Sequence, residues 1–225
     1  MKRPLLIFLA VFVIFGYSFI GATAKVEGEY AKIKQPLVED TLVYLKKLSV
    51  TGDFDGDGKQ DTIYQNTLSG ITHQFVDSFP ASAWDSIQIY FDRIDADVFL
   101  TVRNRKCDTL HLGSGGGLYC LINMGDNNKD KKDEIALVLD NYSFTNISNC
   151  TIYSLCGSQW QELKTFQIHQ FAFEYEGIDE PVFKRIKGFL ESRKNKWFYI
   201  DYMDWFNAEK NQDTVLKPLK IRKCN

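Results

Sequence analysis

Apolar and polar residues alternate over short distances along most of this chain, and the runs are separated by clusters of Gly, Asn, Asp and Ser. The runs are rich in Ile, Val, Thr and aromatic residues, which is typical of strands joined by turns. The predicted strands are 62–65, 87–91, 98–102, 109–112, 134–139, 151–155 and 160–168. The pattern therefore predicts a mainly β protein.

The stretch 122–169 gives the most detailed prediction. It contains a strand, an acidic loop, the continuous apolar strand 135–139, a polar link, the strand 151–155, a turn at 156–159 and a last strand from Trp160. This order predicts a four-stranded antiparallel meander, which has the size of one propeller blade.

Two other stretches have the helical spacing of apolar residues. The first contains Val38, Leu42 and Leu45, and the second contains Val182, Phe183, Ile186 and Leu190. Pro181 is well placed to open the second helix, whereas Gly188 weakens it. We therefore expect propeller-like or curved antiparallel sheets with one or two packed helices.

The N-terminal residues have the pattern of a targeting segment. A basic start and an apolar stretch at 5–15 are followed by small residues at 22–24. This order predicts a signal peptide at 1–24 and a single mainly β domain at 25–225, exported to the periplasm or secreted. An uncleaved membrane anchor is the alternative, because the broadly apolar segment approaches the length that spans a bilayer.

The charge balance argues against nucleic acid as a partner. The formal net charge is −2 at pH 7, and removal of residues 1–24 makes the chain more acidic, because that segment holds two basic residues and no acidic one. The acidity is concentrated in two short loops, which suggests a cation site.

Five cysteines remain after cleavage, and an odd number leaves at least one of them without an intramolecular partner. If 149–155 is a strand, Cys150 and Cys156 lie about 20 Å apart, which is too far for a disulfide. The sequence leaves the other pairings open.

The segment 52–61 carries carboxylates at alternate positions, an arrangement that can wrap a hard cation such as Ca²⁺ with its roughly six to eight oxygen ligands. The candidate ligands are Asp53, Asp55 and Asp57 at positions one, three and five, the backbone carbonyl of Lys59 at seven and Asp61 at nine. Gly58 at position six permits the sharp turn. Position twelve is Tyr64 and not the glutamate of a helix-loop-helix site, so we expect the loop to join two strands.

The segment 125–134 repeats this spacing. Its candidate ligands are Asp126, Asn128 and Asp130 at one, three and five, the Lys132 carbonyl at seven and Glu134 at nine, with Asp133 as an alternative. Lys131 replaces the glycine at position six, so a positive φ there would be strained. The second loop also holds three lysines where the first holds one, and we expect it to bind Ca²⁺ more weakly.

The phrases Gly-Asp-Phe-Asp-Gly-Asp-Gly-Lys at 52–59 and Gly-Asp-Asn-Asn-Lys-Asp at 125–130 resemble the calcium loops of FG-GAP and VCBS-type repeats. In that family these loops join strands within the blades of β-propellers, including those of integrin α chains. The resemblance implies bound Ca²⁺ and a propeller-like fold. It covers two short stretches, and the Phe-Gly…Gly-Ala-Pro phrase of the family is missing here.

A catalytic alternative places a cleft near His111 and Ser114, beside the glycines at 115–117. This segment lacks the G-x-S-x-G spacing of a nucleophile elbow. Our leading hypothesis is therefore an exported, calcium-binding, non-enzymatic module that binds a protein or glycan partner. The alternatives are a periplasmic inhibitor or immunity protein against a lysozyme-like toxin, and a hydrolase with its cleft near His111 and Ser114.

Overall fold

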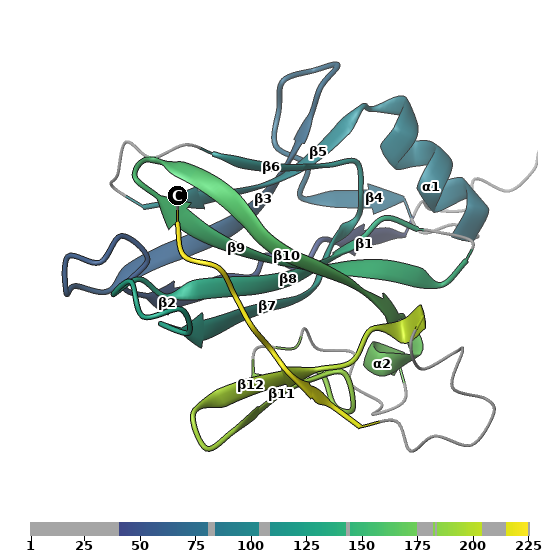
Figure 1. Ribbon diagram of the computed structural model, residues 1–225. Coiled ribbons are helices and arrows are strands. Elements are labelled where there is room, and N and C mark those ends of the chain that lie inside the picture. Colours follow the sequence, from purple (N-terminus) through teal and green to yellow (C-terminus); the bar gives the residue numbers. More distant parts are fainter. Residues whose placement is uncertain are drawn as a thin grey trace, which may run out of the picture. The chain divides into compact units, whose positions relative to one another are not determined.

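The computed structural model describes residues 41–80, 84–103, 109–142, 145–174, 182, 184–203 and 215–224 (Figure 1). The chain divides into two compact units, Met1–Val38 and Glu39–Asn225, and all of these residues belong to the second. The predicted signal peptide at 1–24 lies outside the described residues. Within them, no helix is long and apolar enough to cross a membrane.

Strands dominate the described part of the chain, which confirms the prediction of a mainly β protein. The strands are β1 (Leu42–Tyr44), β2 (Ser49–Gly52), β3 (Asp61–Ser69), β4 (Ser78–Pro80), β5 (Ala96–Val102), β6 (Leu110–Gly113), β7 (Gly117–Gly125), β8 (Glu134–Asp140), β9 (Ile147–Cys156), β10 (Gln159–His169), β11 (Leu190–Arg193), β12 (Lys196–Tyr199) and β13 (Lys217–Pro218). The helices are α1 (Trp84–Arg93) and α2 (Phe171–Glu174).

The strands form four antiparallel sheets. Their strand orders are β1-β4, β2-β3-β5-β6, β10-β9-β8-β7 and β11-β12-β13. The third sheet is the four-stranded meander that the stretch 122–169 predicts. None of the sheets closes on itself within the described residues, and the propeller-like arrangement stays a prediction.

The β7–β10 sheet is buried on both faces, and β8 shows why. Alternate side chains of a strand point to opposite faces of its sheet. Ile135 and Leu137 contribute to an apolar core shared with β2, β3, β5 and β6, whereas Ala136 and Val138 contribute to a second core shared with β11, β12 and the segment after β13. The continuous apolar run of β8 therefore fills two cores at once.

The predicted strand 87–91 is wrong, because this segment lies in helix α1. Ile87 and Ile89 alternate with polar residues as in a strand. The spacing of Ile87, Tyr90 and Phe91 also fits one face of a helix, and these side chains pack in a small core with Phe79. Ile89 falls on the other face and is 47% exposed, so the helical pattern is the one that buries apolar surface.

Neither of the two predicted helices forms in the described residues. Leu42 belongs to β1, which pairs with β4, and Val38 lies outside the described residues. In the second stretch, Ile186 and Leu190 close a tight turn through two backbone hydrogen bonds, and Gly188 within it has a φ of 76°. Glycine adopts this left-handed conformation without a steric penalty, and a right-handed helix cannot continue through it.

Substitutions on α1 test this assignment. We expect Phe91→Ala to lower the free energy of unfolding by about 3–5 kcal/mol, because it leaves a cavity in the core. Ile89→Ala should change it by no more than about 0.5 kcal/mol, because that side chain is on the surface. Denaturant unfolding measured by circular dichroism compares the two. In a strand Ile89 and Phe91 would share a face, so equal losses would contradict the helix.

Candidate metal centres

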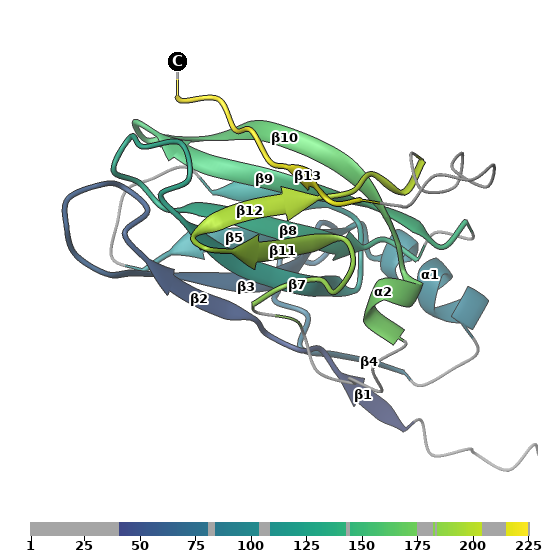
Figure 2. The ribbon, with the colours of Figure 1, turned by 60° about the horizontal axis from the view of Figure 1, so that its bottom comes forward.

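Both acidic loops are the turns of antiparallel hairpins. The loop 52–61 joins β2 to β3, and the loop 125–134 joins β7 to β8, so the expected strand-loop-strand setting is confirmed. We call them the first and the second acidic loop. They lie at the same end of their sheets, on the left in Figures 1 and 2. The helix α1 lies at the opposite end.

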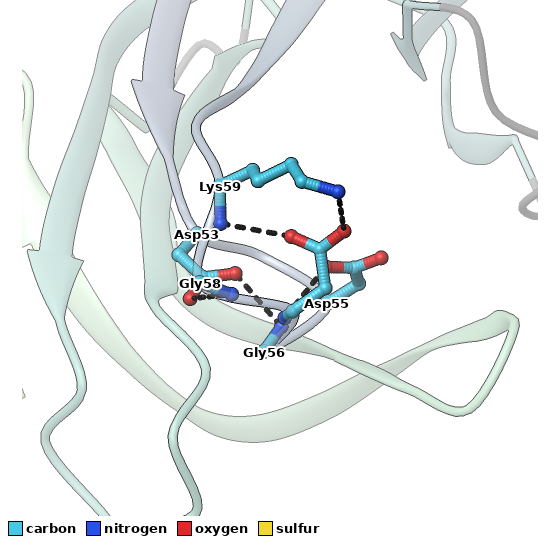
Figure 3. A network of polar contacts seen from close by, with 6 residues as sticks. Asp53, Asp55, Gly56, Gly58 and Lys59 are labelled. Carbon is cyan, nitrogen blue, oxygen red and sulfur yellow. Dashed lines mark hydrogen bonds and ion pairs between the residues drawn. The ribbon is translucent and has the colours of Figure 1, made fainter.

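The first acidic loop is organised by its own carboxylates. Asp53 accepts hydrogen bonds from the backbone N–H groups of Gly56 and Gly58, both at 2.9 Å (Figure 3). Asp55 accepts one from the N–H of Asp57 at 3.1 Å. Such bonds curl the backbone around the side chains, so the loop holds its shape through the oxygens that also face its interior.

Three of the four predicted carboxylate ligands of this loop come together. Asp53, Asp55 and Asp61 each offer an oxygen, and these oxygens lie within 4.8 Å of one another. Asp57 is not in this group, and its carboxylate accepts the backbone N–H of Lys59 at 2.8 Å and lies 3.7 Å from the Lys59 ammonium. The proposed Lys59 carbonyl ligand stays a prediction.

The second acidic loop repeats three of these contacts at equivalent positions, while Asp126 accepts from the N–H of Asp130 where Asp53 accepts from that of Gly56. Lys131 N–H donates to Asp126 at 3.0 Å, as Gly58 does to Asp53. The N–H of Asp130 donates to the side-chain oxygen of Asn128 at 3.0 Å, as Asp57 does to Asp55. The N–H of Lys132 donates to Asp130 at 3.1 Å, as Lys59 does to Asp57. The two loops therefore share one backbone design despite their different residues.

Asp126, Asp130 and Glu134 form the carboxylate group of the second loop, again with oxygens within 4.8 Å of one another. Glu134 has no exposed surface. Its Oε2 accepts the N–H of Asn127 at 2.8 Å, while its Oε1 is buried and has no hydrogen-bond partner among the described residues. A buried carboxylate oxygen without a partner is costly unless a cation or a proton occupies the site.

Burial and neighbouring charges change the acidity of the carboxyl at position nine in both loops. The pKa of Glu134 is raised to about 8, mainly by burial; the Asn127 hydrogen bond opposes this rise, and the charges of Asp130 and Asp126 add to it. Burial also raises the pKa of Asp61, with the charge of Asp57 as the next cause. In both loops the main cause of the raised pKa is burial, and the neighbouring carboxylates add to it.

The two loops differ in the residues that occupy their positions of positive φ. Gly56 and Gly58 have positive φ values of 81° and 83° in the first loop. The corresponding residues of the second loop are Lys129 and Lys131, with φ values of 65° and 73°. A residue with a Cβ pays a steric cost in this region, so the positive φ foreseen at Lys131 is present and strained.

Asp133, considered from the sequence as an alternative ligand, joins the two loops instead. Its backbone N–H donates to the Asp53 carbonyl at 2.8 Å, and its carboxylate accepts the Asp53 N–H at 3.0 Å and the Asn123 amide at 2.9 Å. Gly52 allows this approach, because a Cβ there would meet the Asn123 amide at 2.5 Å and the Asp133 carboxylate at 2.7 Å. Sequence reasoning missed this role, because no local signal pairs residues 80 positions apart.

The residues of the catalytic alternative, His111 and Ser114, lie in and after the edge strand β6 of the β2-β3-β5-β6 sheet. His111, in β6, has a side chain that is 64% exposed, and its Nδ1 lies 2.5 Å from an oxygen of Asp97. Ser114 follows β6 and is exposed. Within the described residues no hydrogen bond joins His111 to Ser114. His111 therefore has an acidic partner, Asp97, but does not contact the hydroxyl that would act as the nucleophile.

Comparison of the chain with protein-family models, with characterised proteins and with solved structures gives no match.

The donors present decide which cation fits the two loops. All the candidate ligands offer oxygen, and neither histidine nor cysteine belongs to either carboxylate group. Oxygen-only sites suit Ca²⁺ and Mg²⁺, whereas Zn²⁺ prefers nitrogen and sulfur. Of these two cations, Ca²⁺ tolerates an irregular set of oxygens, whereas Mg²⁺ demands a tighter octahedral arrangement.

A glycine substitution tests the strained backbone. We expect Lys131→Gly to be more stable than Lys131→Ala by about 1 kcal/mol, because only the glycine relieves the positive φ. Both changes remove the same charge, so Lys131→Ala is the matched control. Thermal unfolding in the presence of a chelator measures the difference without a bound cation. Equal stabilities would contradict the positive φ at this position.

Proposed function

We propose that this protein is an exported β-domain that binds two Ca²⁺ ions and acts as a non-enzymatic binding module. The observation that carries the calcium assignment is the repeated loop design, in which each loop gathers three carboxylates and one contains the fully buried Glu134 with an oxygen that lacks a donor. Bound Ca²⁺ neutralises this charge and occupies the interior that the hydrogen bonds of the loop leave open.

The position of the ligands indicates a structural role for the cation. Asp53 follows the end of β2 and Asp61 begins β3, so one ion bound to both closes the first hairpin. Asp126 and Glu134 stand in the same relation to β7 and β8. Through Asp133, the two closed hairpins fix two separate sheets against each other. The cation would thus stabilise architecture and perform no bond chemistry.

The resemblance to FG-GAP and VCBS-type repeats agrees with this role, since calcium loops there also join strands. We keep a propeller-like relation, the signal peptide at 1–24 and the periplasmic or secreted location as parts of the proposal.

A calcium titration tests the proposal. We expect isothermal titration calorimetry to resolve two unequal sites, with the first loop tighter, because it carries fewer lysines and has glycine at both positions of positive φ. Asp53→Asn should abolish the tighter transition and Asp126→Asn the weaker one. At a calcium concentration of about 100 Kd, a site should stabilise the fold by roughly 2.7 kcal/mol, measured as a rise in Tm.

Asp77→Asn is the matched control for this titration. Asp77 is an acidic residue outside the two loops, where it forms an exposed ion pair with Lys47. Its substitution should leave both transitions in place. Two equally tight sites would contradict the ranking of the loops, and an unchanged Tm and unchanged hydrogen-exchange protection of the loops on chelation would refute the structural role of calcium.

An aromatic strip on the outer face of the β2-β3-β5-β6 sheet supports a partner-binding role. It consists of Phe75, Phe99 and His111. The rings of Phe75 and Phe99 stack with centroids 6.3 Å apart, and those of Phe99 and His111 with centroids 5.9 Å apart. Phe75 is 62% exposed and the His111 side chain 64% exposed, whereas Phe99, which stacks with both, is buried at 9%. Exposed aromatic side chains on a rigid sheet often dominate protein interfaces, so we favour a protein partner over a glycan.

A capture experiment tests this strip. The domain 25–225 serves as bait for secreted and envelope proteins, and Phe75→Ser should weaken capture of a protein partner by tenfold or more, as a hot-spot loss of about 1.4 kcal/mol predicts. Ile89→Ser, an exposed apolar residue on α1, is the control and should retain capture. A toxin-like lytic enzyme among the captured proteins would identify the inhibitor or immunity role. Capture that survives Phe75→Ser would exclude the strip as the partner-binding surface.

The hydrolase remains the second candidate, because the structure pairs His111 with Asp97. Such a pair can orient an imidazole as a general base. Activity of the domain on peptidoglycan, polysaccharide or peptide substrates that is lost in both His111→Ala and Ser114→Ala would favour a hydrolase. Activity that neither substitution affects would exclude His111 and Ser114 as the residues that catalyse it.

A further inference from the structure

The last described residues, Arg222, Lys223 and Cys224, form a segment that we call the C-terminal strap. Cys224 forms a disulfide with Cys156, the last residue of β9. Figure 1 shows this end of the chain beside the turn between β9 and β10. On the other side of the strap, Leu219 is buried in the core, and its N–H donates to the Trp197 carbonyl at 2.8 Å. The strap is therefore anchored at both ends.

The pairing of Cys156 with Cys224 agrees with the exclusion of a bond between Cys150 and Cys156. Cys150 and Cys120 are free and buried in the core. Cys107 lies outside the described residues.

Between its anchors the strap touches the second acidic loop. The carbonyl of Arg222 accepts a hydrogen bond from the Asn128 side-chain NH₂ at 3.3 Å. The ammonium of Lys223 donates to the Lys129 carbonyl at 3.2 Å. On the opposite side, the Arg222 guanidinium donates to the Glu162 carbonyl of β10 at 3.0 Å.

The contact with Asn128 settles which end of its amide faces the loop. An amide has a donor end and an acceptor end of nearly equal shape, and only the oxygen can bind a cation. The strap accepts from the NH₂ end, while the oxygen accepts the Asp130 N–H at 3.0 Å inside the loop. Asn128 is 8% exposed, so water has little access to compete for either end.

We propose that the disulfide-held strap orients Asn128 as an oxygen ligand, so that the second acidic loop binds Ca²⁺ tightly only while the Cys156–Cys224 bond is intact. The inference rests on the proposed calcium function and adds redox control to one of its two sites. Arg222 acts as a positioning residue through its backbone carbonyl.

The disulfide is the decisive part of the strap because its other contacts are weak. Arg222 and Lys223 are exposed, and each of their hydrogen bonds contributes only about 1 kcal/mol. The ends of chains become disordered unless they are tied down. Loss of the bond therefore releases the Arg222 carbonyl. Among the described residues, the Asn128 amide is then held in the loop by the Asp130 N–H, a donor from which Asp126 also accepts at 3.0 Å, so the orientation of the amide is no longer fixed from both ends.

Calcium titration of the disulfide variant tests this inference. In the domain 25–225, we expect Cys156→Ser with Cys224→Ser to weaken the second-loop affinity about tenfold, as the loss of a partner that orients a ligand does. The first loop should keep its affinity and serves as the reference within the same molecule. Reduction of the folded domain with a dithiol, which converts the Cys156–Cys224 disulfide to two thiols and is itself oxidised to a disulfide, should reproduce the loss. If the double variant does not fold, Cys156→Ser in a chain that ends at Ile221 retains Leu219 and removes the strap.

Asn128→Asp separates ligand orientation from a general loosening of the loop. A carboxylate has two equivalent oxygens and no donor end, so its orientation does not depend on the strap. In this background, loss of the disulfide should change the second-loop affinity by less than about twofold, and the double-mutant cycle isolates the difference.

Each outcome has a distinct meaning. A tenfold loss in both backgrounds would overturn the orientation of Asn128. An unchanged second-loop affinity in the disulfide variant would overturn the redox control while calcium binding stands. No calcium binding at either loop of the unaltered domain would overturn the proposed function together with this inference.

Discussion

One carboxylate, that of Asp133, holds the two acidic loops together. It accepts the N–H of Asp53 from the first loop and the amide of Asn123 from β7. The two loops are the turns of hairpins in different sheets, so this contact sets how those sheets meet at one end. The contact also brings the two acidic loops together, and the repulsion between their carboxylates makes it more costly for either loop to carry its negative charge without a cation. The arrangement of the two sheets and the proposed cation sites therefore depend on the same carboxylate.

The two loops show how one backbone design tolerates different residues. The first loop uses Gly56 and Gly58 where φ is positive, and the second uses Lys129 and Lys131. The strain of the second loop is offset by contacts that its neighbours provide. The Lys132 ammonium donates to the Leu155 carbonyl of β9 at 2.8 Å, and the strap supports the loop from the same side. The second loop, whose residues suit a positive φ less well, is thus held by additional contacts from β9 and the strap.

The sequence predicts well what is local and periodic. The strand pattern from 122 to 169 and the carboxylates at alternate positions are both properties of neighbouring residues, and the structure contains the meander and both hairpin loops. Helix α1 was missed because the segment 87–91 carries two patterns. Ile87, Ile89 and Phe91 alternate as in a strand, whereas Ile87, Tyr90 and Phe91 have helical spacing, and the core with Phe79 selects the second pattern. Asp133 and the strap could not be foreseen, because the contacts are made by residues that are distant in sequence.

The alternating side chains of β8 have a consequence for how the domain unfolds. The two cores share the β7–β10 sheet as a common wall, and the first residue of β8, Glu134, is also the last residue of the second acidic loop. Neither core can open without displacing the surface that lines the other. We therefore expect the β-sheets that meet at β8 to melt as a single cooperative unit, with no stable half-folded form in which one core survives alone.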